Sequence, residues 1–111
     1  MPRHYIRVTT HTALQSVMHI LWDEAKNRRN KAKHRVGFET AQQVFDDPHH
    51  LSLQDRHVGG EERWQTLGMV GGVVLLLVAH TFGARDGRDV IRIISARKAT
   101  KHERRRYEQG L

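Results

Sequence analysis

The pattern of apolar positions in the first half of the chain predicts two helices of different character. Asp23 is a good N-cap and Glu24 favours the first turn, so a helix is expected from there to about His34. Its only apolar residues are Ala25 and Ala32, which predicts a helix on the surface. Apolar residues with helical spacing then predict a second helix, which packs on the core; they are Phe38, Ala41, Val44 and Phe45. The Asp-Asp-Pro sequence of residues 46–48 is expected to end this helix.

The pattern of the second half is typical of β-structure. The longest apolar run, Val73 to Ala79, predicts a central strand that is buried on both faces, one of them under the second helix. The preceding pair Gly71-Gly72 predicts a tight hairpin turn, because both central residues of such a turn need a positive φ. Further strands are expected at residues 51–53, 63–67 and 90–94, with a polar loop at Gly59-Gly60 and a turn at residues 83–87.

A short helix is predicted to close the chain. Thr100 is its N-cap and Glu103 stands at N3, which is the spacing of a capping box. The predicted fold class is therefore α+β: a small antiparallel β-sheet packed by two N-terminal helices, with a short C-terminal helix. A chain of 111 residues suits one domain, expected at residues 18–111. Residues 1–17 show no clear period and are interpreted as an N-terminal extension, with Met18 as a candidate start.

Charge adds a functional indication to this outline. The chain has 19 Lys+Arg against 12 Asp+Glu, a net charge of +7. Six cations lie in residues 26–35, here called the N-terminal basic cluster, and six more in residues 97–106, the C-terminal basic cluster. Such density is self-repelling unless a polyanion binds, which indicates a polyanionic partner and favours RNA among the nucleic acids, acidic proteins and anionic membranes that a basic protein attracts; solvated helix faces are the alternative reading.

Other classes of protein fit the composition poorly. The chain has no cysteine, which fits a reducing cytoplasm, and its longest apolar run is far shorter than the roughly 20 residues of a membrane-spanning helix. Although there are nine histidines, none has the spacing of a helical metal site, so neither a metal nor another cofactor is expected. His34 and His80 are instead interpreted as candidate groups for proton transfer.

An ordered set of short motifs over residues 18–108 resembles the BrnT family. The set consists of Trp22-Asp23-Glu24-Ala25-Lys26-Asn27, Lys33-His34, Val36, Phe38, Ala41, Val44-Phe45-Asp46-Asp47-Pro48, Glu62-Arg63, Leu67-Gly68, His80-Thr81, Arg92 to Thr100, Glu103-Arg104 and Tyr107. Two features depart from the family pattern: residues 1–17, and Arg35 where a small residue is expected. The resemblance implies a RelE/ParE-like fold and the toxin of a type II toxin–antitoxin pair, a ribonuclease that blocks growth. It also implies a BrnA-type antitoxin as partner, in a heterotetramer.

The resemblance suggests roles for particular residues. A ribonuclease without metal can use the substrate's own 2′-hydroxyl as nucleophile, so the protein supplies cations, a base and an acid. Arg63, Arg92 and Arg97 are assigned to the phosphate, and His34 or Glu39 to proton transfer. The residues assigned to RNA binding are Lys33, Lys98, Lys101, Arg104 and Tyr107. Two other functions stay open at this point: a nucleic-acid-binding module without catalysis, and a ParE-like toxin that acts on DNA gyrase.

Overall fold

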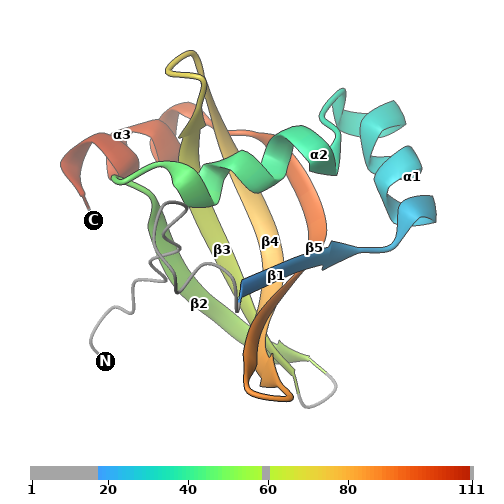
Figure 1. Ribbon diagram of the computed structural model, residues 1–111. Coiled ribbons are helices and arrows are strands. Elements are labelled where there is room, and N and C mark those ends of the chain that lie inside the picture. Colours follow the sequence, from blue (N-terminus) through green and yellow to red (C-terminus); the bar gives the residue numbers. More distant parts are fainter. Residues whose placement is uncertain (1–17, 59–60, 111) are drawn as a thin grey trace.

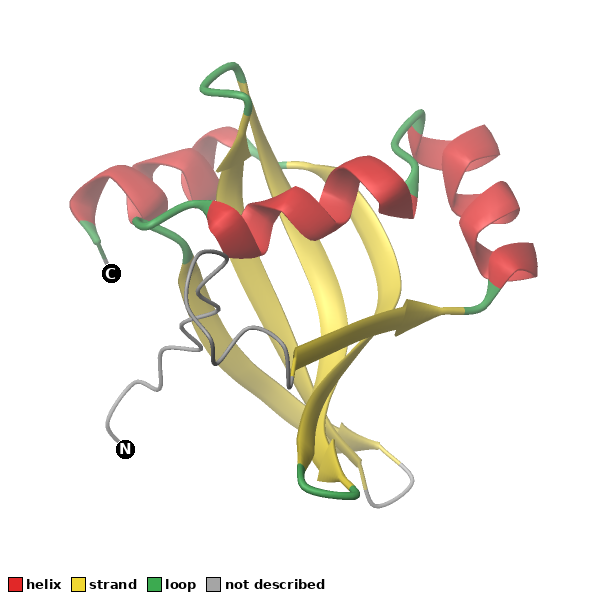
Figure 2. Ribbon diagram, viewed as in Figure 1, coloured by secondary structure: helices red, strands yellow, loops and turns green. Residues whose placement is uncertain are grey.

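The computed structural model describes residues 18–58 and 61–110, which form one five-stranded sheet with helical elements on both faces (Figure 1, Figure 2). The strand order is β1-β5-β4-β3-β2, so β4 lies at the centre. In chain order the elements are β1 Met18–Trp22, α1 Glu24–His34, α2 Phe38–Ala41, the 3-10 helix η2 Gln42–Asp46, β2 Leu51–Val58, β3 Glu61–Val70, β4 Val74–Arg85, β5 Arg88–Lys98 and α3 Lys101–Gln109. The expected extension at 1–17 and loop at Gly59-Gly60 lie outside the described residues.

The sheet is mixed, and the prediction of a small antiparallel sheet packed by two N-terminal helices is wrong. β1 pairs in parallel with β5, whereas all other neighbours are antiparallel. α1 does not cover a face of the sheet: it flanks the sheet edge beside β5 (Figure 1). The RelE/ParE-like description of the fold is not confirmed. The error arose because β1 is short and its partner lies almost at the other end of the chain, a contact that no local pattern reveals.

The predicted second helix is confirmed as α2 and η2, which together cover one face of the sheet. Phe38 and Val44 are fully buried there. Beneath them lie core residues of the sheet that include Trp64, Val78 and Ile91. Gly68 makes this close packing feasible, because a Cβ at that position would lie 2.6 Å from the Cβ of Val44.

The opposite face of the sheet is covered at one end by α3. Leu67, Leu75 and Leu77 form a second, smaller apolar cluster, against which Ala99 and Tyr107 pack. β4 is therefore buried on both faces, as its apolar run predicts, except that Val73 belongs to the preceding turn and is 83% exposed. The capping box that begins α3 is confirmed: the hydroxyl of Thr100 accepts from the Glu103 N–H, and the Glu103 carboxylate accepts from the Thr100 N–H.

The two hairpin turns that lie within the described residues use residues with a positive φ. Gly71 and Gly72 have φ values of 61° and 67°, as the predicted tight turn requires. The second turn is narrower than expected and consists of Asp86-Gly87, while Gly83 belongs to β4.

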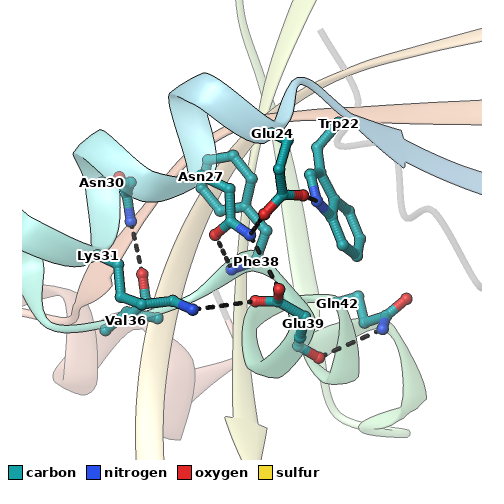
Figure 3. Close-up of polar contacts among 9 residues, drawn as sticks. All are labelled: Trp22, Glu24, Asn27, Asn30, Lys31, Val36, Phe38, Glu39 and Gln42. Carbon is teal, nitrogen blue, oxygen red and sulfur yellow. Dashed lines mark hydrogen bonds and ion pairs between the residues drawn. The ribbon is translucent and has the colours of Figure 1, made fainter.

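Two buried asparagines dock α1, a helix with almost no apolar surface (Figure 3). The side-chain amide of Asn30 donates to the carbonyls of Ala96 and Val36 at 2.8 and 2.9 Å, and its oxygen accepts from the Ala96 N–H. β1 pairs with β5 only as far as Ile93. Beyond that point Asn30 makes the backbone hydrogen bonds at Ala96 that a neighbouring strand would make. Asn27 accepts from the Phe38 N–H and donates to Glu24 and Glu39. Amide hydrogen bonds therefore hold α1 where apolar packing is missing.

His80 lies in the core within a chain of buried polar side chains. Its Nδ1 must donate to the carbonyl of Thr81, which can only accept, at 3.0 Å. Its Nε2 therefore accepts from the Thr66 hydroxyl at 2.7 Å, and Thr66 accepts from the Ser52 hydroxyl at 2.6 Å. Burial lowers the pKa of His80 from 6.5 to about 4. This arrangement indicates a structural role for the imidazole.

The lowered pKa of His80 predicts a loss of stability in mild acid. Between pH 6.5 and about 4 the unfolded chain binds a proton at His80 that the folded chain refuses, so the free energy of unfolding should fall as the pH falls through that window. The loss is on the order of 3 kcal/mol, at about 1.4 kcal/mol per pH unit. Urea unfolding at pH 7.5, 5.5 and 4.5 measures it, with His80→Gln as the control that can keep both hydrogen bonds. An equal pH dependence in the two proteins would contradict this account.

Candidate functional site

Two of the arginines assigned from the sequence lie in one row across the sheet, on the face opposite α2. Arg63 of β3 and Arg92 of β5 are both paired with Thr81 of β4, so the three side chains point to the same face. Ile91 and Ile93, on either side of Arg92, are buried in the core, and alternation therefore turns Arg92 away from it. The two arginine Cα atoms are about 10 Å apart across the sheet, close enough for both side chains to reach one phosphate.

The part of this face around the row is called the open sheet face, defined by Arg63, Gln65, Ala79, Thr81 and Arg92. The described helices lie elsewhere: α1 at the edge, α2 on the other face, and α3 over the leucine cluster. Arg92 is exposed, Arg63 is half-buried and Thr81 between them is 8% exposed. Among the described residues no carboxylate forms an ion pair with Arg63, and its buried Nε has no hydrogen-bond partner.

β1 adds further side chains beside this row. Leu21 is paired with Arg92 and is 47% exposed. His19, two residues earlier on the same face, lies 3.1 Å from Arg88, measured between its Nε2 and the arginine Nη1. Because arginine stays protonated, Arg88 donates this bond and His19 accepts it. A histidine therefore lies one row from Arg92.

Arg97 is engaged by the protein itself. Its two terminal nitrogens donate to the two carboxylate oxygens of Glu103 at 2.8 and 2.9 Å. These hydrogen bonds raise the pKa of Arg97 and lower that of Glu103. Arg97 thus joins the end of β5 to the capping box of α3. It lies five residues along β5 from Arg92, beyond the register shift opposite Ala79 and His80.

The structure places Glu39, one of the two residues assigned to proton transfer, away from Arg63 and Arg92. Glu39 lies in α2, on the other side of the sheet, where Asn27 donates to it at 3.0 Å and the Lys31 ammonium is 3.8 Å away (Figure 3). Hydrogen bonds from its own N–H and from Asn27 lower the pKa of Glu39, which weakens it as a base. His34 is half-buried at the end of α1, one turn beyond Asn30.

The residues assigned to RNA binding are mostly exposed cations at the ends of helices and strands. Lys33, Lys98, Lys101 and Arg104 are all exposed. Tyr107 differs, because its hydroxyl donates to Asp47 at 2.5 Å, and burial together with this bond raises its pKa. Asp47 also accepts from the Met69 N–H at 2.7 Å, so Tyr107 fixes the C-terminal half of α3 to β3.

Sequence reasoning missed Thr81 and His19, because only strand register places them beside the arginines. The one available signal was alternation around Arg92, which shows that an arginine between buried isoleucines faces away from the core. Arg35, which the sequence marks as unusual, has φ 62° and caps α1 in the left-handed region, where a residue without Cβ is favoured. The structure thus gives the physical reason for expecting a small residue there.

The described part of the chain contains no cluster of three or more potential metal ligands. Nor do the described residues include a helix of the length and apolar character needed to cross a membrane.

Comparisons with known proteins assign the family. The chain is similar in fold to the crystal structure of the Brucella abortus ribonuclease toxin BrnT, with a TM-score of 0.53 and 23% sequence identity over 76% of this chain and 99% of that one. No curated protein matches it in sequence. The family model for the ribonuclease toxin BrnT of type II toxin–antitoxin systems matches residues 22–103, which is most of the described chain. The protein therefore belongs to the BrnT family and is a ribonuclease toxin of a type II toxin–antitoxin system.

Proposed function

We propose that RNA binds across the open sheet face, with the scissile phosphate held between Arg63 and Arg92. The observation that carries this proposal is the shared row: both guanidinium groups are presented from a rigid sheet to the same side of Thr81. A planar guanidinium forms two parallel hydrogen bonds to phosphate oxygens and keeps its charge throughout the reaction. Unlike Arg97, Arg63 is not neutralised by a carboxylate of the described chain.

The proposed reaction needs no metal ion, since the nucleophile belongs to the substrate. The 2′-oxygen forms a bond to phosphorus while the bond from phosphorus to the 5′-oxygen breaks. A base takes the proton of the 2′-hydroxyl, and an acid gives a proton to the leaving 5′-oxygen. The products are a 2′,3′-cyclic phosphate and a 5′-hydroxyl. Arg63 and Arg92 stabilise the negative charge that develops on the phosphate oxygens.

We assign proton transfer to a histidine, and not to Glu39. Glu39 is held by Asn27 and lies on the other side of the sheet. His19 lies on the same face as Arg92 and one row away, while His34 is the candidate suggested by the sequence. An imidazole can take up or release a proton near neutral pH, so this side-chain type can serve as the base or as the acid of the reaction.

The other assigned residues receive supporting roles in this proposal. Arg97 and Tyr107 position α3 through Glu103 and Asp47, one contact in each half of the helix. The exposed cations Lys101 and Arg104 of α3 lie beside the leucine-covered end of the face, where they can bind the RNA backbone. Lys98 is paired with Leu76, which packs in the core under α2, so its side chain points to the other face of the sheet. Membership in a type II toxin–antitoxin family also implies an antitoxin partner.

Cleavage of unstructured RNA by the purified toxin should proceed unchanged in excess EDTA, and its products should carry cyclic phosphate and 5′-hydroxyl ends. RNA with 2′-O-methyl groups is the matched control and should stay intact, because its nucleophile is blocked. Mass spectrometry of the fragments identifies the ends. Loss of cleavage in EDTA, restored by one divalent metal, would contradict the proposed chemistry.

The same assay over a range of pH identifies the proton-transfer group. One of the two variants, His19→Gln or His34→Gln, should lower kcat by 100-fold or more and remove one limb of the pH profile. Positioned proton transfer contributes about 10²–10⁴ in rate. Glu39→Gln should leave the profile unchanged. If both histidine variants keep the wild-type profile, the assignment to histidine is wrong.

A further inference from the structure

The N-terminal basic cluster is almost unpaired although it lies on an ordered helix. Among the described residues Lys31 is its only member in an ion pair, with Glu39. The exposed residues of the cluster that take part in no such pair are Lys26, Arg28, Arg29, Lys33 and Arg35. Because Asn27 and Asn30 hold α1 from its inner side, these five cations are not required for docking the helix. Their charges are therefore available to a partner.

The contacts of α1 determine how these cations are arranged around the helix. Successive helical residues turn by about 100°. Asn30 faces the edge of β5 at Ala96, and Lys31 faces Glu39 on the α2 side. Lys26, Lys33 and Arg29 lie about 40°, 60° and 100° beyond Asn30, on the side away from Lys31. Arg28 and Arg35 lie on the same side as Lys31.

The side of α1 that carries Lys26 and Lys33 is the side of the open sheet face. α1 flanks the sheet edge beside β5, and α2 occupies the space on one side of that edge (Figure 1, Figure 3). Moving around α1 from the α2 side, one meets the sheet edge at Asn30 and then the opposite side of the sheet. Arg92 points to that opposite side. Lys26, Arg29 and Lys33, here called the α1 stripe, therefore border the open sheet face.

The geometry points to the α1 stripe as a second RNA-binding surface, which takes the strand that leaves the open sheet face past β5. The cations stand at i, i+3 and i+7, so successive charges lie about one turn, 5.4 Å, apart along the helix. A row of point charges on a regular repeat suits the repeating phosphates of a single strand. The adjacent open sheet face favours RNA over an acidic protein segment as the occupant. The inference rests on the proposed RNA site but concerns binding beyond the cleaved phosphate.

The test compares two sets of substitutions on the same helix. Lys26→Gln with Lys33→Gln removes two charges from the α1 stripe, and Arg28→Gln with Arg35→Gln removes two from the α2 side. Binding of a fluorescein-labelled 2′-O-methyl RNA of about 15 nucleotides is measured by anisotropy across a salt series. The first variant should raise Kd about tenfold or more at 0.1 M salt and make the slope of log K against log salt shallower by about 1.4, at 0.7 per lost contact. The second should change Kd less than threefold, with an unchanged slope.

Several results would overturn the inference. Equal losses in both variants would mean that only net charge matters, and unchanged binding in the first would remove the stripe from the RNA site. If the first variant keeps RNA binding but loses its complex with the antitoxin, the stripe is a protein interface. Thermal unfolding of both variants confirms that α1 stays docked. Failure of the proposed function gives a different result from failure of this inference. Arg63→Ala would then cleave RNA at the wild-type rate, whatever the α1 stripe variants do.

Discussion

Arg63→Ala and Arg92→Ala should each lower kcat for RNA cleavage by about 100-fold or more, while the folded structure persists. Each substitution removes a fixed positive donor from the phosphate on which charge develops, and loss of one such donor typically costs 10²–10³ in rate. Neither arginine contributes to the apolar core, since both point away from α2. Single-turnover cleavage of a defined RNA measures the effect, and circular dichroism melting verifies the fold.

Conservative variants and a matched arginine sharpen this test. Arg63→Lys and Arg92→Lys keep the charge but lose the paired hydrogen bonds of the guanidinium, so they should recover only part of the rate. Arg28→Ala removes one charge from the far side of α1 and should retain the wild-type kcat. Wild-type cleavage by Arg63→Ala and Arg92→Ala would exclude the row around Thr81 as the reaction centre. A comparable loss in Arg28→Ala would attribute the effect to net charge.

Asn30→Ala should destabilise the protein by about 3–5 kcal/mol, a large share of the 5–15 kcal/mol typical of a domain. The substitution leaves the N–H and C=O of Ala96 and the C=O of Val36 without their partner, and each buried unsatisfied group costs about 1–3 kcal/mol. Water that enters the vacated space recovers part of this cost, which sets the lower end of the range. Urea unfolding at pH 7.5 measures the change.

Asn30→Asp provides the control that isolates hydrogen bonding from side-chain volume. The carboxylate keeps the shape and can still accept from the Ala96 N–H, but it cannot donate to the two carbonyls and it introduces a buried charge. It should therefore destabilise at least as much as alanine does. If both variants lose less than 1 kcal/mol, α1 is held by something other than its asparagine contacts. RNA binding at the α1 stripe should weaken in parallel with the undocking of the helix.

Local patterns in the sequence predicted those features of the fold that depend on neighbouring residues. The N-cap at Asp23, the stripe of Phe38 and Val44, the Gly71-Gly72 turn and the capping box of Thr100 are all present. Each depends on residues within a few positions of one another, because helix caps, turn dihedrals and apolar periodicity act at that range. The ordered family motifs likewise identified the BrnT family, which the comparison confirms.

Features that depend on distant residues were beyond the sequence. The parallel pairing of β1 with β5 and the position of α1 at the sheet edge both rest on contacts across most of the chain. The predicted site shows the same limit. Strand register aligns Arg63 and Arg92, whereas Glu103 engages Arg97 and the sheet separates Glu39 from the arginine row.

The sequence by itself determined that this protein is a small basic BrnT-family toxin and which of its cations are candidates for RNA. Only the tertiary structure decided which of those cations face the same way, which are neutralised by a carboxylate, and which side of α1 borders the open sheet face. The physical reason is that charge and composition are properties of single residues, whereas a phosphate-binding site requires several side chains to converge. Strand register and helix docking produce that convergence, and long-range contacts determine both.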